Sequence, residues 1–170
     1  MLVKISDTMG HPRKHRAKWS RPLKPFEKTR LETEKGVMQQ FGLRRKHELW
    51  RAEGVVRDFR RRARELQAVQ DPKMQEELFQ RLKKIGFSVS MLDDVLAMKT
   101  EDILARRLQT VVVKRGLAKT LKQARQLIVH RHVIVDGTAV RWPSALVSAD
   151  MEDKIDVSQK VKSKNIAAGV

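Results

Sequence analysis

The chain has 170 residues, a length that suits one compact domain or two small ones and excludes a large multidomain enzyme. Its 37 Lys and Arg residues outnumber its 20 Asp and Glu residues, and the formal charge of +17 favours a polyanionic partner, nucleic acid first and acidic membrane second. The absence of cysteine excludes disulfides, thiolate zinc sites and a cysteine nucleophile.

The N-terminal sequence lacks the apolar segment of a signal peptide, and no window approaches 18 uncharged apolar residues, so we expect a soluble protein in the cytoplasm. Met1 and Met9 are equally acceptable starts. The charge is uneven, because acids outnumber bases between residues 69 and 105 while bases dominate on both sides. This distribution favours two cationic surfaces over a chain that is merely rich in solvated charge.

Residues 1–30 are predicted to form an extended basic arm, because three of the five prolines fall there and helical periodicity is weak. Trp19 and Phe26 interrupt the charges of this arm. They either stack on bases or anchor the arm to the rest of the protein, and the sequence does not separate these alternatives. The candidates for phosphate contact in the arm are Arg13, Lys14, Arg16 and Lys18.

Residues 31–102 are predicted to form a helical domain that binds nucleic acid. Periodicity becomes helical at Leu31, and Gly42 is a plausible stop before a second helix. In this second helix, apolar residues recur at steps of three and four from Leu49 to Leu66, which predicts one buried stripe. The fork of an Arg guanidinium suits phosphate, and the candidates on the other faces are Arg44, Arg45, Lys46, Arg60, Arg61 and Arg62.

The acidic interval contains several predicted helix starts. Asp71 followed by Pro72 predicts a cap and first residue of a helix that Gly86 closes. Ser90 with Asp93 is expected to cap a short helix, and Thr100 is expected to start another that runs without a break through the two arginines at 106–107. We interpret the acids at these starts as compensation of the helix dipole, not as catalytic groups.

The segment from Lys119 onward combines a helix signal with a hairpin signal. Thr120, three residues before Gln123, is typical of a capping box, and Lys122 and Arg125 are expected on an outward arc of the helix that follows. Asp-Gly at 136–137 between β-branched residues predicts a two-residue hairpin turn. Further cations are expected to converge on the same surface from the preceding helix and its end, at Arg106, Arg107, Lys114, Arg115 and Lys119.

The C-terminal half resembles the α-L RNA-binding module typified by the S-four family of small-subunit ribosomal proteins, over RRLQTVVVKRGLAKTLKQARQLIVHRHVIVDGTAVRWPSALV. The helical region of that family resembles FGLRRKHELWRAEGVVRDFRRRARE, and GHPRKHRAKW is similar to the arm of its archaeal and eukaryotic members. The resemblance covers about Gly10 to Val157 and implies an α+β fold. Within it, a mainly helical N-terminal region with a basic arm precedes a module at 103–160, where helices pack on a short antiparallel hairpin or sheet, and a tail at 161–170.

The resemblance also implies a function and a contact surface. It implies a structural constituent of the small ribosomal subunit, which binds ribosomal RNA (rRNA) directly and helps a multi-helix junction to fold. It further implies a place near the messenger entry site, contact with the S-three and S-five families, and an influence on decoding accuracy. In the module, the RNA surface is expected at or near Arg106, Arg107, Lys119, Thr120, Lys122, Arg125, His130, Arg131 and His132.

Two departures from the family pattern concern the histidine pair and metal binding. Many relatives carry glycine between the two histidines, so either Arg131 tolerates a left-handed helix end or the turn differs locally. The cysteines that hold zinc in some bacterial members are absent. His130 and His132 alone are too few ligands for a closed zinc site, so we predict no metal and expect them to bond phosphate or ribose or to be structural.

An enzyme is disfavoured, because no phosphate-binding loop, dinucleotide fingerprint or nucleophile elbow occurs in the sequence. We therefore expect no cofactor, no small-molecule substrate and no membrane partner. The alternative function is a free RNA-binding translational regulator or ribosome-rescue factor that uses the same module. Trp142, next to Pro143, is expected to close the hairpin side of the core and not to bind a base.

Overall fold

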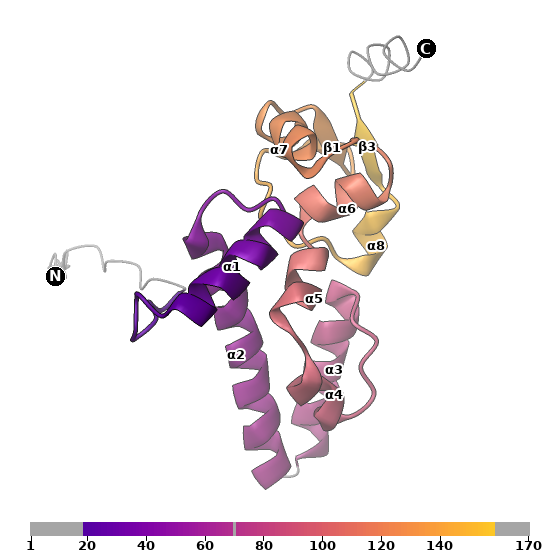
Figure 1. The fold of residues 1–170 in the computed structure, drawn as a ribbon. Coiled ribbons are helices and arrows are strands. Elements are labelled where there is room, and N and C mark those ends of the chain that lie inside the picture. Colours follow the sequence, from indigo (N-terminus) through magenta and orange to yellow (C-terminus); the bar gives the residue numbers. More distant parts are fainter. Residues whose placement is uncertain (1–18, 70, 159–170) are drawn as a thin grey trace, which may run out of the picture.

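The computed structural model of the protein describes residues 19–69 and 71–158 (Figure 1). The predicted phosphate contacts of the arm, Arg13, Lys14, Arg16 and Lys18, and the tail at 161–170 lie outside this range. The elements follow one another as α1 Lys28–Gln40, α2 Lys46–Val69, α3 Pro72–Ile85, α4 Leu92–Ala97, α5 Thr100–Ala105, α6 Leu108–Lys114, α7 Leu121–Val129, β1 Val133–Val135, β2 Thr138–Ala139, α8 Ala149–Glu152 and β3 Ile155–Val157.

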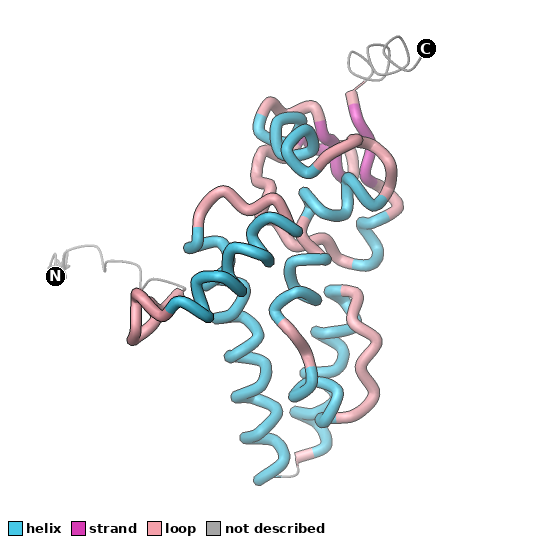
Figure 2. Tube along the Cα trace, viewed as in Figure 1, coloured by secondary structure: helices cyan, strands magenta, loops and turns pink. Residues whose placement is uncertain are grey.

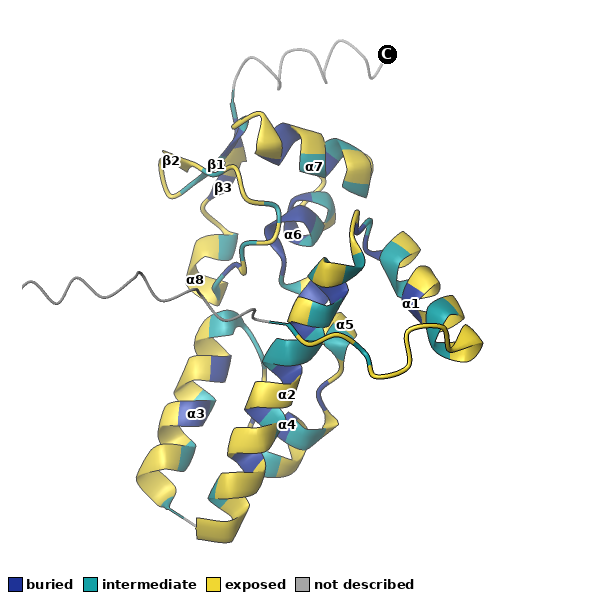
Figure 3. Cartoon of the chain, turned by 90° about the vertical axis from the view of Figure 1, so that its left-hand side faces the viewer, coloured by how far each residue is buried: buried dark blue, intermediate teal, exposed yellow. Residues whose placement is uncertain are grey.

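The helical region is organised around α2, the longest helix described. Figure 1 and Figure 2 show α3, α4 and α5 along one side of α2 and α1 across its N-terminal end. The apolar stripe predicted for α2 is confirmed, since Leu49, Ala52, Val56, Phe59 and Ala63 are all buried. Figure 3 shows buried positions recurring among exposed ones along α2. An amphipathic helix of this kind is stable because its apolar face packs against its neighbours.

The C-terminal region joins α6, α7 and a small antiparallel sheet of order β2-β1-β3. Val133 pairs with Val157 and Val135 with Ile155, so β3 completes the sheet beside β1. A second apolar core forms under α6 and α7 and includes Leu108, Val111, Val112, Ala124, Ile128 and Val133. The α+β fold class is confirmed.

Local signals predicted correctly the hairpin turn and the start of α7. Asp136 and Gly137 have φ values of 49° and 76°, the two left-handed residues of a type I′ turn. The Thr120 hydroxyl accepts a hydrogen bond from the Gln123 N–H at 3.2 Å. The reciprocal bond is shifted by one residue, because the Gln123 side-chain oxygen accepts from the Lys119 N–H at 2.8 Å.

The expected continuous helix from Thr100 onward is wrong, because α5 and α6 are separated at Arg106 and Arg107. Arg107 has extended backbone angles, φ −70° and ψ 142°. The loop at 143–147 supplies hydrogen bonds in place of helical ones: the Leu108 N–H donates to the Ala145 carbonyl at 2.8 Å, and the Val147 N–H donates to the Arg106 carbonyl at 3.0 Å. A contact distant in sequence therefore breaks the helix.

Two smaller expectations are also wrong. The carboxylate that caps α4 belongs to Asp94, not Asp93, and accepts from the N–H groups of Ser90 and Met91 at 3.1 and 3.0 Å. These two bonds lower the pKa of Asp94 below its usual value. Trp142 does not close the core, since it is 61% exposed, and the Arg141 guanidinium lies 5.5 Å from its ring centroid.

Among the described residues, no helix combines the length and the apolar character needed to cross a bilayer.

Candidate nucleic-acid interface

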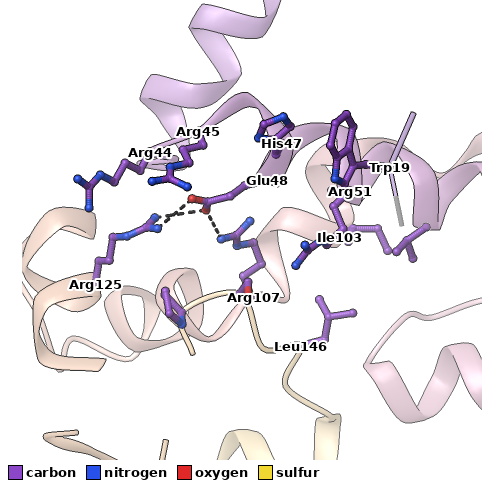
Figure 4. A pocket seen from close by; sticks show the side chains of 14 residues that line it. Trp19, Arg44, Arg45, His47, Glu48, Arg51, Ile103, Arg107, Arg125 and Leu146 are labelled. Carbon is purple, nitrogen blue, oxygen red and sulfur yellow. Dashed lines mark hydrogen bonds and ion pairs between the residues drawn. The ribbon is translucent and has the colours of Figure 1, made fainter. Parts of the chain in front are cut away.

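One carboxylate connects the helical region to the C-terminal region. Glu48 lies in the first turn of α2 and accepts hydrogen bonds from Arg107 at 2.6 Å and from Arg125 at 2.9 Å (Figure 4). Arg107 comes immediately before α6, and Arg125 lies in α7. Glu48 therefore holds three helices together at the point where the two apolar cores meet.

The electrostatics of this cluster favour the charged forms. Burial acts to raise the pKa of Glu48, but hydrogen bonds from Arg125 and Arg107 and their positive charges outweigh it, so the pKa lies below its usual value of 4.5. Arg107 is only 5% exposed, and burial lowers the pKa of its guanidinium while Glu48 opposes this effect. The cluster is an ion triad at neutral pH.

Arg106 connects to a different part of the protein. Its guanidinium donates to the Glu152 carboxylate at 2.7 Å and to the Val147 carbonyl at 3.2 Å. Gly86, at φ 97°, lies so close that a Cβ at this position would be 2.7 Å from the Arg106 guanidinium carbon. Arg106 and Arg107 thus hold separate parts of the fold together, although they are adjacent in sequence.

The expected convergence of cations on one surface is found only in part. Arg115 donates to the backbone carbonyls of Glu152 and Ile155, so it lies against α8, as Arg106 does, and against the start of β3. Arg125 was expected to point outward, but Glu48 holds it and its side chain is 25% exposed. Lys114, Lys119 and Lys122 are exposed and have no carboxylate partner in the part of the chain that the structure describes; the Thr120 side chain is used as the cap of α7.

Exposed cations surround the ion triad. Arg44, Arg45 and Arg51 are exposed and have no carboxylate partner among residues 19–69 and 71–158. With Trp19, His47 and the loop at 143–146, they line a pocket of about 470 Å³ (Figure 4). We name this the triad pocket. Glu48 is the only acid that the described residues contribute to it, and it is already paired with two arginines.

Trp19 packs against the start of α2. Its ring centroid lies 4.3 Å from that of His47 and 5.6 Å from that of Trp50. Trp50 in turn donates to Glu34 at 3.2 Å. Phe26 is 91% exposed and anchors nothing. Anchoring of the arm and base stacking both remain predictions for Trp19, and base stacking remains a prediction for Phe26.

A second basic groove lies between α1 and α7. It has a volume of about 840 Å³ and apolar lining from Leu31, Met38 and Leu43, and no acid is among the described residues that line it. Its cations are Lys35, Arg44, Lys46, Lys122 and Arg125. Lys46 is paired with the buried Glu34 at 3.0 Å and Arg125 with Glu48 at 2.9 Å, so the exposed charge of this groove comes mainly from Lys35, Arg44 and Lys122.

The cations farther along α2 are separate from the triad pocket. Arg62 is 14 positions from Glu48, which corresponds to roughly 20 Å along a helix. Arg60 donates to the Met98 carbonyl and is partly buried, whereas Arg61 is exposed and makes only long ion pairs of 3.9 Å. The predicted candidates of α2 therefore form two groups and not one continuous patch.

The two histidines flank a left-handed residue. Arg131 has φ 61°, so it adopts the left-handed geometry that glycine favours, and the first of the two alternatives for this turn holds. The rings of His130 and His132 are 6.3 Å apart. Within the described residues, no three metal-ligating side chains gather in one place.

Sequence reasoning did not single out His47, Glu48 or Arg51. A signal for Glu48 existed, because it is the only acid between Gly42 and Ala52 in a stretch rich in cations. A lone carboxylate among cations on an amphipathic helix is a candidate for an internal ion pair.

Comparison with known proteins identifies the chain's relatives. Residues 106–153 match the S4 domain. The chain is 47% identical over 150 residues to small ribosomal subunit protein uS4 of Nanoarchaeum equitans, covering 84% of this chain and 83% of the relative. It is 46% identical over 154 residues to the protein of the same name from Hyperthermus butylicus, covering 87% of each. The chain therefore belongs to the uS4 family of small ribosomal subunit proteins.

Proposed function

We propose that the protein is a structural constituent of the small ribosomal subunit in the cytoplasm and that it binds small-subunit rRNA directly. The names of its relatives support a ribosomal role. The observation that carries the proposal is the ion triad of Glu48, Arg107 and Arg125, which fixes two cationic regions relative to each other. Two basic surfaces in a fixed arrangement suit a folded RNA better than an unstructured RNA, because RNA helices are recognised largely by shape.

The proposed mechanism is mainly electrostatic. Exposed cations neutralise phosphates and release counterions, while the fixed geometry of the helices selects one RNA shape. Arg106 and Arg107 are proposed to position this surface and not to supply its main contacts, because both are already bound to carboxylates. The principal contacts in the described residues are proposed to be Arg44, Arg45, Arg61, Arg62, Lys114, Lys119, Lys122, His130, Arg131 and His132, with the arm residues Arg13, Lys14, Arg16 and Lys18 in addition.

Finer parts of the function rest on the family resemblance. We propose that the protein helps a multi-helix rRNA junction to fold during assembly, because a preorganised cationic surface stabilises the folded RNA more than the unfolded RNA. It is also proposed to contact the S-three and S-five families near the messenger entry site and to influence decoding accuracy. No catalytic step and no cofactor is part of the proposal.

Salt titration of RNA binding tests the proposal. We expect the wild type to prefer small-subunit rRNA to an unrelated RNA of equal length. Lys122→Glu should lower affinity and reduce the salt slope by about one unit, because it removes one phosphate contact. The matched control is Lys73→Glu on α3, which is equally exposed and lines neither basic pocket, and it should have a much smaller effect. Equal effects of the two variants, with circular dichroism unchanged, would overturn the proposed surface.

Sedimentation separates a ribosomal constituent from a free regulator or rescue factor. A constituent should be as abundant as small subunits and should remain with them through a high-salt wash. Recovery mainly at the top of the gradient would favour the alternative.

A further inference from the structure

The triad pocket combines two kinds of chemistry. One wall is aromatic, from the rings of Trp19 and His47, whose planes are inclined by 43°, and the neighbouring lining is aliphatic, from Val55, Ile103 and Leu146. The rim carries Arg44, Arg45 and Arg51, none of which has a carboxylate partner in the described chain (Figure 4). A ligand that complements this pocket therefore has a flat, largely apolar part and a negative charge beside it.

An unpaired nucleotide has both properties. RNA-binding proteins recognise extruded bases by stacking them on aromatic rings or on Arg planes, while cations hold the flanking phosphates. A pocket of about 470 Å³ has room for one nucleotide but not for a duplex. An acidic peptide would satisfy the arginines, but its carboxylates would leave the aromatic wall without a matching surface.

The charge balance favours an anion at this place. Glu48 is engaged by both Arg107 and Arg125, so the one acid that residues 19–69 and 71–158 place in the pocket does not neutralise the rim. Like charges held close together are costly unless a counter-charge binds between them. The lining also comes from several separate parts of the chain: Trp19, the segment at 44–55, the turn from Ile103 to Arg107, Arg125 of α7 and the loop at 143–146. The triad helps to hold these parts in position.

We propose that the triad pocket binds one unpaired nucleotide of the RNA, with its base against Trp19 and His47 and its phosphates against Arg45 and Arg51. This inference rests on the proposed function and deepens it. Electrostatic matching selects the shape of the RNA, and the pocket adds a requirement for an extruded base at one position.

The first experiment uses the full chain and short probes, so that it does not depend on rRNA. The affinities of a hexanucleotide of adenosine and of an abasic phosphodiester hexamer of equal charge are measured at the same salt concentration. We expect the base-containing probe to bind more tightly, and Trp19→Leu to weaken it about tenfold while changing the abasic probe less than about twofold. Trp142→Leu is the matched control, because Trp142 is exposed and lies outside the pocket.

Three results of this experiment would overturn the inference. The first is equal affinity for the two probes. The second is loss of base preference in Trp142→Leu with none in Trp19→Leu, which would move stacking to the hairpin loop. The third is displacement of both probes by a polyglutamate peptide at equal charge concentration with no effect of Trp19→Leu, which would indicate an acidic protein partner.

The second experiment separates base binding from anchoring of the arm, using small-subunit rRNA. If Trp19 contacts a base, Trp19→Leu should lower affinity without changing the salt slope, and Trp19→Phe should restore affinity to within about twofold. If Trp19 only anchors the arm, the salt slope should fall because the arm's cations are released, and the inference fails. Arg51→Gln should reduce the slope by about 0.7 to 0.9.

The two proposals fail in distinguishable ways. A wild type with no preference for small-subunit rRNA, but with a Trp19-dependent preference for bases in the hexamers, would refute the proposed function and leave the pocket inference standing. The reverse combination, tight rRNA binding with no effect of Trp19→Leu, would refute only the pocket.

Discussion

Replacing Glu48 by glutamine tests whether the ion triad joins the two halves of the fold. The change removes the negative charge and leaves two arginines facing a neutral side chain. Arg107 is 5% exposed, so its charge would have little access to water. Removing one partner of a buried ion pair typically costs about 3 to 5 kcal/mol. We take the lower end, about 3 kcal/mol, because Glu48 and Arg125 keep 17% and 25% of their side-chain surface exposed and solvent screens part of the interaction.

Urea unfolding followed by circular dichroism measures this loss. With a denaturant slope of about 2 kcal/mol per molar, typical of a small protein, a loss of about 3 kcal/mol lowers the midpoint by about 1.5 M. The matched control is Glu65→Gln, whose carboxylate is 65% exposed and 3.9 Å from Arg61, and it should change stability by less than about 0.5 kcal/mol. A Glu48→Gln midpoint within about 0.3 M of the wild type, at an unchanged slope, would refute the view that the triad stabilises the junction.

Four further predictions concern stability. The pKa of Glu48, like that of Glu34, is lowered in the folded protein. The stabilisation by Glu48 is therefore complete above the usual pKa of 4.5 and is lost as the pH falls through the lower folded pKa. The difference in urea midpoint between wild type and Glu48→Gln should shrink below about pH 4.5, and a constant difference would contradict this role of Glu48. Arg131→Gly should raise the free energy of unfolding by about 0.5 to 1 kcal/mol, and with it the thermal midpoint, because glycine adopts φ 61° without the steric cost of a side chain. No increase would mean that this turn is unstrained. Gly137→Val should lower the free energy of unfolding by about 2 kcal/mol, and with it the thermal midpoint, since a β-branched residue resists φ 76° in the turn. An unchanged midpoint would be inconsistent with the type I′ turn. Thr120→Ala should cost about 1 kcal/mol in urea unfolding through loss of the α7 cap, whereas Thr120→Ser should cost little.

The parts of the fold that sequence predicted correctly are those with local causes. The stripe of α2 follows from apolar spacing, the start of α3 from Asp71 and Pro72, and the turn at Gly137 from the need for positive φ. Each of these signals acts within a few residues. A single sequence is therefore enough to predict these elements.

The features that sequence missed depend on contacts between distant residues. The break at Arg107 requires the Ala145 carbonyl, which is 38 positions from Arg107, and the role of Glu48 requires Arg125, 77 positions away. Trp142 is exposed just before a segment in which Leu146 pairs with Arg107, and no local pattern reveals that pairing. Likewise, counting cations identifies a basic protein but does not tell which guanidinium groups are already bound to carboxylates within the fold.

The position of Glu48 has a consequence for how this module is transferred between proteins. The match to the S4 domain covers residues 106–153, which includes Arg107 and Arg125 but not the acid that neutralises them. A fragment cut at that boundary would expose two uncompensated guanidinium groups and would stick to polyanions with less discrimination than the intact chain. A chimaera that keeps the original selectivity needs a host that supplies a carboxylate at the same place.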